Sequence, residues 1–476
     1  MAWLNALRKT TPQTHNAWGY RFEWSEDHLT PEASEPLKFR CDTLADECLE
    51  ILDKISPPAR PGLPRNRERE AEQDKKTGSG DPAPARDLYI LLRDNVDKDE
   101  KLQKLWKQVN TVPDWVDWEQ IERGQDTFYR YSAAAITGLA FQSLLGGMGA
   151  ARVTETLART GGFSPKVARG RLFETTQHIL QCTKSLQSLQ PGGDGWASTI
   201  RVRFLHAAVR RRILKLAEAR PEYYNVKEYG IPINDLDSIG TICVFSATLI
   251  WMSFPRQGIF LRKQETEDYV ALWRYIAYVI GCPDEYFATA QKAKATMESV
   301  FESEVHPNEM GALLANNIIK SIENEPPTYE SADMLSASAR WLNGPSLSDA
   351  LKLPNPGLYY WVLMAGQCLF IMGICYTYRA IPSWDKKKVA NMKRILWTLV
   401  VESKWGLNKK HAKFDFQYVP EYSTLTELHQ GKGAQVERSS LEMRNLKAFA
   451  AGIAILAAVT WVGVKITTTL VGLVWR

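Results

Sequence analysis

The amino-acid sequence predicts an all-α protein that ends in a membrane-anchor helix. Between Asp87 and Glu304 apolar residues recur at helical spacing, and no alternating strand pattern of useful length interrupts them. Helix start and stop signals divide this region into successive helices. Near the C-terminus, residues 448–464 form a cleaner apolar stretch, which resumes after Lys465 and reaches the length of a membrane span. These observations favour a helical body followed by one membrane helix.

The composition is that of a globular protein. The chain has 476 residues, of which 45% are hydrophobic and 24% charged, and this excludes a disordered chain. Its net charge of +5 comes without a Lys/Arg stripe that carries interleaved aromatic residues, so no nucleic-acid partner is expected. The seven cysteines form no CxxC pair, which argues against a zinc or iron–sulfur site and suggests buried, reduced thiols. The N-terminus lacks the long apolar region of a secretory signal.

The chain before the helical body divides into two parts. Residues 1–56 are aromatic at first and are expected to be helical over about 41–55. Residues 57–87 combine a Pro-Pro pair, a charged run and a stretch rich in Gly, Ser and Pro, so we predict a solvated, disordered linker. The helical domain proper is predicted over 88–440, and the anchor helix over 446–475.

Local signals place the first helices of the domain. Residues 127–151 are apolar and rich in small residues, which permits close helix packing. Ser164 and Pro165 suit an N-cap and a first helical position, so a helix is predicted from there to about Ser188. A glycine-rich break at 191–195 then separates it from the next helix.

Further signals continue the helical series. Asn234 is expected to cap a helix whose body, residues 239–254, is apolar on nearly all sides and therefore central. The helix after it is predicted to begin near Thr266 and to stop at Gly281.

Two apolar stretches could enter a membrane. Residues 358–376 are of about membrane length but contain one Gln and two Gly, and both a membrane and a buried position stay open for them. A single span at 448–475 is typical of a tail anchor, which would leave the preceding domain in the cytosol, although a buried terminal helix is the alternative. The basic region between the two stretches, 386–410, also favours a cytosolic face.

His206 is the most informative single residue. It lies in a largely apolar helix, with Arg203 at i−3 and Arg210 at i+4 on the same face. One imidazole aimed at a pocket with cations beside it is typical of an axial haem ligand with propionate-binding arginines. The alternative is a buried histidine held by hydrogen bonds, on a helix whose arginines face water.

Polar residues on two other helices could face the same pocket. Arg171 and Thr175 are spaced i,i+4, with His178 one turn further, and this pair could bind a propionate or orient dioxygen. It could equally be an exposed arginine beside a threonine that bonds back to its own helix. Thr241 and Ser238 belong to a polar stripe whose hydroxyls need partners, and the helix backbone could supply them. The chain contains no HExxH, paired ExxH, GxSxG or GxGxxG motif.

Four sequence blocks, at 169–175, 202–210, 230–241 and 271–281, resemble those of a known family. This is the rubber oxygenase (latex clearing protein) family, together with the ER-bound fungal oxygenases of mycophenolic acid biosynthesis. The resemblance covers roughly residues 106–304, and the order and spacing of the blocks are more specific than any one of them. It implies a globin-like helical core around haem b, and cleavage of a carbon–carbon double bond of an isoprenoid chain by O₂ into carbonyl products.

The resemblance also implies roles for individual residues. His206 is similar to the axial iron ligand and Arg203 to its supporting arginine. Arg171 and Thr175 match the distal-side arginine and threonine, and Thr241 matches a threonine near the haem. By a looser alignment, Glu155 corresponds to the acidic residue proposed as base. One departure stands out, because rubber-cleaving members carry a lysine just before the distal threonine, where this chain has Glu174. An open or water-holding sixth iron position is therefore expected, and polyisoprene becomes a doubtful substrate.

The sequence thus predicts a membrane-anchored, haem-b-dependent oxygenase that uses O₂ on a lipophilic, isoprenoid or prenylated substrate. Its catalytic domain would face the cytosol at the endoplasmic reticulum. Glu155 would take an allylic proton if burial strengthens it as a base. Two alternatives stay open: a non-catalytic haem sensor or carrier, and a haem-free helical interaction protein at a membrane.

Overall fold

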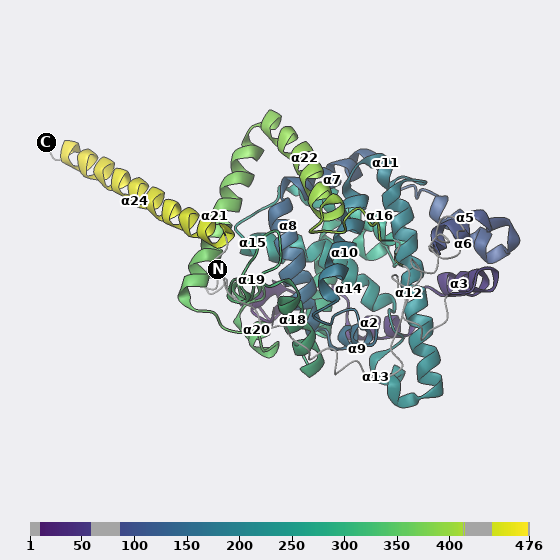
Figure 1. The fold of residues 1–476 in the computed structure, drawn as a ribbon. Helices are drawn as coiled ribbons and strands as arrows, with labels where there is room; N and C mark the ends of the chain where they lie inside the picture. The colour runs from purple at the N-terminus through teal and green to yellow at the C-terminus, as the bar shows by residue number, and fades with distance from the viewer. Residues whose placement is uncertain (1–9, 59–85, 413, 415–439, 475–476) are drawn as a thin grey trace, which may run out of the picture.

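The computed structural model describes residues 10–58, 86–412, 414 and 440–474, and these are almost wholly helical (Figure 1). The predicted all-α class is confirmed. One addition was not predicted: an antiparallel hairpin of β1 (Thr14–Ala17) and β2 (Tyr20–Glu23). Strands of four residues are too short for alternation to reveal them. Most of the predicted linker lies outside the described residues.

The helices before the main body include the one predicted over 41–55, and the last of them is capped by a residue of the linker predicted over 57–87. They are α2 (Pro31–Ser34), the 3₁₀ helix η1 (Glu35–Phe39), α3 (Thr43–Ile55) and α5 (Leu88–Asp94). The helix expected over 41–55 is α3, whose N-cap Asp42 accepts a hydrogen bond from the backbone N–H of Ala45. Asp87, predicted to end the linker, is instead the buried N-cap of α5 and forms an ion pair with Arg201.

The apolar region predicted over 127–151 is divided into several short helices. The elements here are η2 (Val96–Lys98), α6 (Glu100–Asn110), α7 (Trp118–Arg130), α8 (Ser132–Gly138), the π-helix η3 (Leu139–Leu145), η4 (Gly146–Gly149) and α9 (Ala151–Arg159). The chain turns by 101° between the α8–η4 segment and α9. Because the segment is mostly buried, its apolar character reflects tight packing between neighbours.

The next helices hold most of the predicted site. They are α10 (Ala168–Thr183), α11 (Leu186–Leu189), α12 (Asp194–Ala219), η5 (Pro221–Tyr223), α13 (Val226–Tyr229) and α14 (Asp235–Phe245). The cap at Asn234 is confirmed, since its side chain accepts from the N–H of Asp237. The start predicted for α10 was wrong by one turn. The carbonyl of Ser164 accepts from Val167 and Ala168, so Ser164 closes a turn that precedes the helix.

The central apolar helix predicted over 239–254 is interrupted. After α14 come the π-helix η6 (Leu249–Ser253) and α15 (Phe254–Arg256), with a bend of 41°. Ser246 lies at the break, and its hydroxyl donates to the carbonyl of Ile242, a bond that bends helices. The elements that follow are α16 (Lys263–Ile280), η7 (Glu285–Phe287) and α17 (Ala290–Glu304). Gly281 ends α16 in the left-handed conformation, as predicted.

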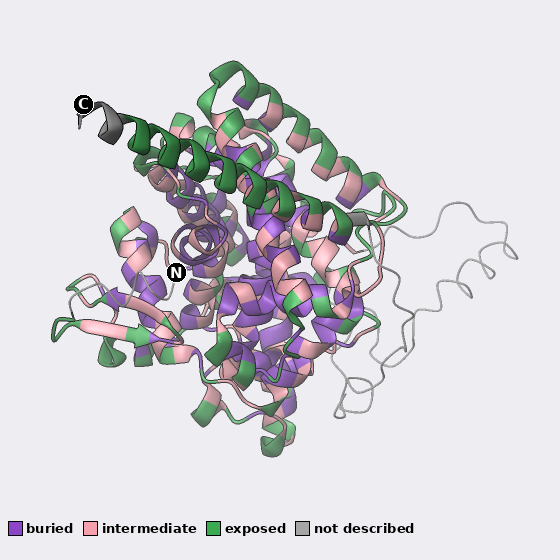
Figure 2. Cartoon of the chain, turned by 90° about the vertical axis from the view of Figure 1, so that its left-hand side faces the viewer, coloured by how far each residue is buried: buried purple, intermediate pink, exposed green. Residues whose placement is uncertain are grey.

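The C-terminal part contains both apolar stretches. Its elements are α18 (Glu309–Ile322), α19 (Ala332–Asn343), α20 (Pro345–Ala350), α21 (Leu358–Ala380), α22 (Pro382–Trp397), the π-helix η8 (Thr398–Glu402) and α24 (Ser440–Val474). Among the described residues, two helices qualify as membrane spans by length and composition, over Leu358–Ala380 and Leu441–Thr469, or up to four segments if each bent pair counts as one. The window in α21 is 39% buried by the protein, whereas none of the α24 window is buried. Figures 1 and 2 show α24 leaving the body as an exposed rod.

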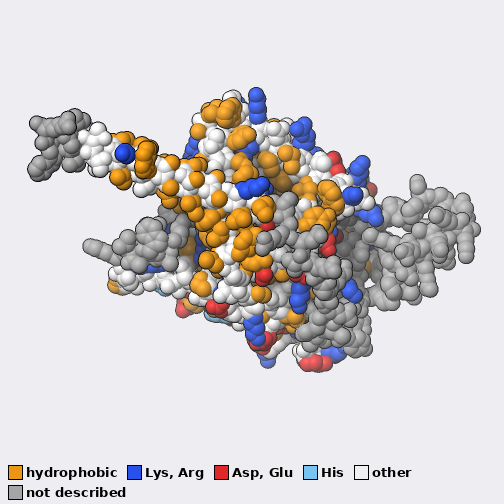
Figure 3. Space-filling model, turned by 60° about the vertical axis from the view of Figure 1, so that its left-hand side comes forward, with side chains coloured by type: hydrophobic (Ala, Val, Ile, Leu, Met, Phe, Trp, Pro, Cys, Tyr) orange, Lys and Arg blue, Asp and Glu red, His pale blue; other side chains and the backbone are white. Residues whose placement is uncertain are grey.

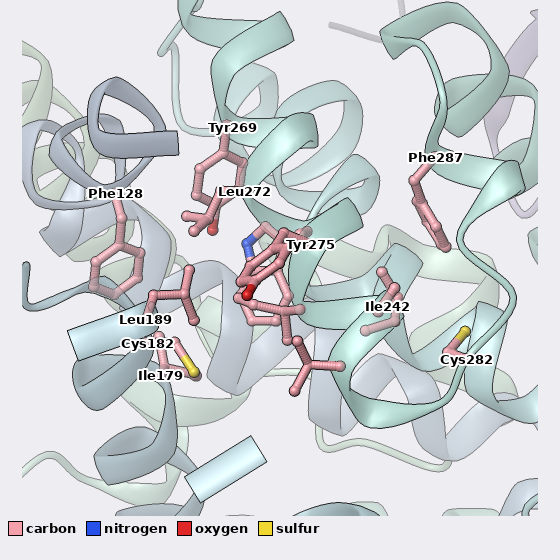
Figure 4. Close-up of a cluster of buried hydrophobic side chains, with 14 of the residues drawn as sticks. Phe128, Ile179, Cys182, Leu189, Ile242, Tyr269, Leu272, Tyr275, Cys282 and Phe287 are labelled. Carbon is pink, nitrogen blue, oxygen red and sulfur yellow. The ribbon is translucent and has the colours of Figure 1, made fainter. Parts of the chain in front are cut away.

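The main core lies where α7, α10, α12, α14 and α16 meet. Figure 4 shows part of it, with Tyr269 and Tyr275 of α16 above Ile179 and Cys182 of α10. Six of the seven cysteines are buried and none is in a disulfide, as the scattered pattern predicted.

Candidate functional site

Helices α10 and α12 pack antiparallel, and their contacts determine which residues of the two helices lie opposite each other. Nδ1 of His178 lies 3.0 Å from Oγ of Ser198, and Sγ of Cys182 lies 3.7 Å from the carbonyl oxygen of Gly195. Each turn back along α10 is therefore matched by a turn forward along α12. Continued toward the start of α10, this register places Arg171 level with His206.

His206 projects from the middle of α12 and lacks a protein partner. Its side chain is only half-buried, although it belongs to a helix in the interior. No hydrogen bond joins its ring to any other residue that the structure describes. Burial, with the nearby charge of Arg210 acting in the same direction, lowers the pKa of His206 to about 4. The imidazole is therefore neutral at physiological pH, with a lone pair available to a metal.

His178, the other core histidine, is already occupied. Its ring bonds to Ser198, lies within 3.8 Å of the Cys182 thiol and meets the ring of Phe414 edge-on at 6.0 Å. Burial, together with the proximity of His206, lowers the pKa of His178 to about 4. The sequence could not separate the two histidines, but their contacts do.

The two arginines beside His206 are held from outside the pocket. Arg203 donates from Nε and Nη2 to the carboxylate of Asp42, at 2.6 and 3.0 Å. Arg210 donates to Asp46 at 2.6 and 2.8 Å and to the carbonyl of Ile233 at 3.0 Å. Both guanidinium groups are thus paired with acidic side chains at the start of α3, and that of Arg210 also with the loop before α14. This geometry leaves neither free for a propionate and gives both a role in positioning α12.

The acidic partners of Arg203 and Arg210, which were not predicted from the sequence, lie at the start of α3. Asp42 and Asp46 are one turn apart, so they form one acidic face that matches the arginine face of α12. Gly281 closes over this contact, since a Cβ there would overlap Nε of Arg203 and the carboxylate of Asp42.

The distal-side candidates lie together on α10. Nη1 of Arg171 is 3.6 Å from the carboxylate of Glu174, and both side chains are about one-third exposed. Thr175 is exposed, and no bond joins its hydroxyl to another described residue. Thr176, its neighbour, instead bonds back to the carbonyl of Leu172. The hydroxyl of Thr175 is consequently available to a ligand.

Thr241 lies on α14 and Glu155 on α9. Thr241 is exposed although α14 lies in the middle of the molecule (Figure 1), and its hydroxyl donates to the carbonyl of Asp237 at 2.7 Å. Ser238 bonds back to Asn234 in the same way, so the polar stripe of α14 is satisfied by its own backbone. Glu155 on α9 accepts from Arg159 at 2.6 Å, which holds its carboxylate in an ion pair.

The solvent exposure of the candidate side chains and the character of their neighbours indicate whether the surroundings of His206 suit haem b. Thr175 and Thr241 are exposed and His206 is half-buried although their helices form the main core, so all three side chains are accessible. The same helices carry partly buried apolar side chains, among them Phe173, Leu205 and Phe245. An unpartnered neutral imidazole beside apolar surface fits a flat, hydrophobic iron porphyrin. Within the described ranges, no group of three or more His, Cys, Asp or Glu could hold a bare metal ion.

Comparison with known proteins identifies the fold and the family. A solved structure of latex clearing protein in the closed state matches with a TM-score of 0.53 and 15% identity, over 78% of this chain and 95% of that chain. At this identity the likeness concerns the fold. No curated protein matches the chain. The family model described as "ER-bound oxygenase mpaB/B'/Rubber oxygenase, catalytic domain" matches residues 129–367, half of the chain and all of the candidate site. The chain therefore belongs to the family of the ER-bound and rubber oxygenase catalytic domains.

Proposed function

We propose that this protein is a membrane-anchored oxygenase that holds haem b through His206 and uses O₂ on a lipophilic alkene. Family membership supports the oxygenase class. The observation that carries the haem assignment is the state of His206, whose imidazole is neutral, central and free of described hydrogen-bond partners. His178 has partners on both sides and is assigned a structural role.

The chain's own residues suit oxidation of an apolar substrate. Haem b, when bound, supplies the redox-active iron on which dioxygen chemistry depends. Arg203 and Arg210 keep α12, and with it His206, in place through Asp42 and Asp46. Arg171 and Thr175 offer N–H and O–H donors on the α10 side, where they would orient polar atoms in a largely dry space. Thr241 contributes to the wall of the same space.

Glu174 distinguishes this site from that of the rubber-cleaving relatives. In place of their lysine, the chain carries a carboxylate that lies 3.6 Å from Arg171. A cation at this position could close the site, whereas Glu174 partly neutralises Arg171 and leaves the pocket open to ligands. This favours a smaller isoprenoid or prenylated substrate over polyisoprene.

Glu155 is proposed as the base for an allylic proton. The ion pair with Arg159, at 2.6 Å, orients its carboxylate. The overall reaction would be balanced without another reductant, since one C=C bond and one O₂ give two carbonyl groups. Glu155 would then accept a proton and return it within the same cycle.

The location follows from α24. We propose that this helix enters the endoplasmic reticulum membrane, with the catalytic domain in the cytosol. The family description supports the ER, and the unburied apolar window of α24 supports insertion. A substrate that dissolves in lipid is concentrated next to such an enzyme.

Oxygen consumption by the purified protein in lipid nanodiscs tests the function. With haem supplied and a prenylated alkene present, O₂ uptake should match the formation of carbonyl products. Haem binding without O₂ uptake or product on a panel of prenylated alkenes would identify a sensor or carrier. Absence of haem binding would leave a helical interaction protein.

A further inference from the structure

We propose that the tip of the α21–α22 hairpin is a second membrane contact, seated in the interface of the bilayer that α24 enters. The hairpin tip is defined by Phe260, Tyr378, Ile381 and Trp384. The inference rests on the proposed anchor role of α24 and adds an orientation of the catalytic body to it.

The hairpin tip is an exposed aromatic and apolar patch. Relative exposures are 56% for Phe260, 47% for Trp384, 38% for Ile381 and 37% for Tyr378. The rings of Tyr378 and Trp384 lie 6.0 Å apart. Contacts tie Phe260 to the hairpin, because its carbonyl accepts from Arg379 at 2.9 Å and its N–H donates to the hydroxyl of Tyr376 at 2.9 Å. The four side chains therefore form one surface, of the composition that favours a membrane–water interface.

Positive charge surrounds the hairpin tip. The exposed cations next to it are Arg262, Lys263, Lys386 and Lys387. The two nearest acids in sequence, Glu265 and Asp385, are turned inward and pair with Arg130. Glu267, one turn into α16, is half-buried and pairs with Lys263 at 3.8 Å. A positive rim around exposed aromatic residues matches a bilayer surface with anionic lipids.

The hairpin tip is continuous with the base of α24. Leu369 of α21 lies against Gly452 of α24, beyond which the side chains described up to Thr469 are exposed. From Leu369, an exposed line at i+4 spacing runs through Gly373 and Thr377 to Ile381, over about 18 Å. Figure 3 shows hydrophobic side chains covering this face, from the base of α24 up over the hairpin.

The length of α24 places the bilayer surface at the same level. Beyond its contact with Leu369, the helix continues from Ile453 to Val474, which is about 33 Å, and its side chains described up to Thr469 are exposed. A bilayer core is about 30 Å thick, so this segment alone suffices to cross it. The interface then meets the body near Leu369. Since α21 runs across the base of α24 (Figure 1), the hairpin tip reaches the same interface.

Depth-dependent fluorescence quenching in vesicles tests this arrangement with the full-length protein. An environment-sensitive dye is attached to a single introduced cysteine in a Cys41→Ser background, because Cys41 is the one native thiol that is not buried. The three sites are Ile381→Cys at the hairpin tip, Val459→Cys in α24 and Val112→Cys as control. Val112 is also an exposed aliphatic residue and follows α6, which lies on the side opposite to α24 (Figure 1). The vesicles contain phosphatidylcholine, phosphatidylserine and a lipid with a nitroxide in the upper acyl chain.

We expect the dyes at 459 and 381 to be quenched several-fold more than the dye at 112. Quenching at 459 with 381 equal to 112 would overturn the inference and leave the anchor intact. No quenching at 459 would overturn the anchor itself, and the inference with it. As a matched change, Trp384→Glu should reduce quenching at 381 and leave quenching at 459 unaltered.

Discussion

At the scale of single residues, the two core histidines differ in their contacts, and the proposed haem site rests on this difference. Both are neutral at physiological pH, since burial lowers the pKa of each to about 4. His178 uses its ring for contacts with Ser198 and Cys182, whereas the ring of His206 has no described partner. Sequence spacing could find His206 but not this difference, because hydrogen-bond partners come from residues distant in the chain.

Arg171 and Thr175 should matter for turnover and not for cofactor retention. Replacing either by an apolar residue, Arg171→Met or Thr175→Val, removes one donor from the proposed oxygen side. Turnover should fall by about 10²-fold, the usual effect of removing one such donor. Haem content, measured by absorbance per protein, should be unchanged. Thr176→Val is the matched control, since that hydroxyl bonds to its own helix. Wild-type turnover in both variants would remove the assigned role.

The α3–α12 ion pairs should contribute to stability. In Asp42→Asn the N-cap of α3 is kept, but the buried guanidinium of Arg203 loses its counter-charge. The free energy of unfolding should fall by about 3 kcal/mol, toward the lower end for a broken buried pair because Asp42 is partly exposed. Thermal unfolding measures this, with Glu50→Gln on the outer face of the same helix as a control expected to be silent. Equal stability of Asp42→Asn and wild type would contradict the positioning role.

At the scale of the element, caps were predictable and interruptions were not. Asn234 and Gly281 act through their own backbone neighbourhood, so their signals are local. Ser164 resembles a cap equally well but closes a separate turn. The break at Ser246 depends on one serine bonding back within an apolar run, which hydrophobic periodicity does not register.

The base of α24 should dock in a pH-dependent way. Glu442 accepts hydrogen bonds from the N–H and hydroxyl of Ser331, at 3.0 and 2.7 Å. Burial, with the repulsion of Glu442 added and Arg444 opposing, raises the pKa of the adjacent Glu330 to about 7, from its ordinary 4.5. The folded state thus binds this proton more tightly than the unfolded state. The stabilisation that protonation of Glu330 gives to the folded state is complete below pH 4.5 and is lost as pH rises through 7.

Thermal unfolding at pH 5 and pH 8 measures this dependence. Glu330→Gln mimics the protonated form, so the variant should gain stability relative to wild type as pH rises. Glu325→Gln, at a nearby carboxylate whose side chain is 39% exposed, serves as control. The same difference between wild type and Glu330→Gln at both pH values would contradict the docking account.

At the scale of the whole molecule, the fold class and the C-terminal anchor candidate follow from the sequence, but the docking of the anchor does not. The anchor was predicted over residues 446–475, whereas α24 is described from Ser440 onward and these earlier turns pack on α21. A Cβ at Gly366 would overlap the carbonyl of Asn445, so this contact is close. Hydropathy identifies the apolar span but not the neighbours of its first turns.

Truncation separates the docked and inserted parts of α24. Deleting residues 453–476 removes the exposed span and keeps the contact with α21, so the protein should become soluble with its thermal stability unchanged. Deleting 446–476 also uncovers α21, and this variant should be less stable or aggregate. Fractionation and thermal unfolding check both. If the protein lacking 453–476 stays on membranes at high salt, the hairpin tip suffices for membrane binding. If both truncated proteins fail to fold, the separation of α24 into a docked and an inserted part is contradicted.

The absorption spectrum of the purified full-length protein, supplied with haemin during expression, tests the central claim most directly. Wild type should show a Soret band with about one haem per chain. His206→Gln should lose it while remaining folded by circular dichroism, and His178→Gln should keep it. A colourless wild type, or a Soret band that persists unaltered in His206→Gln, would contradict the account.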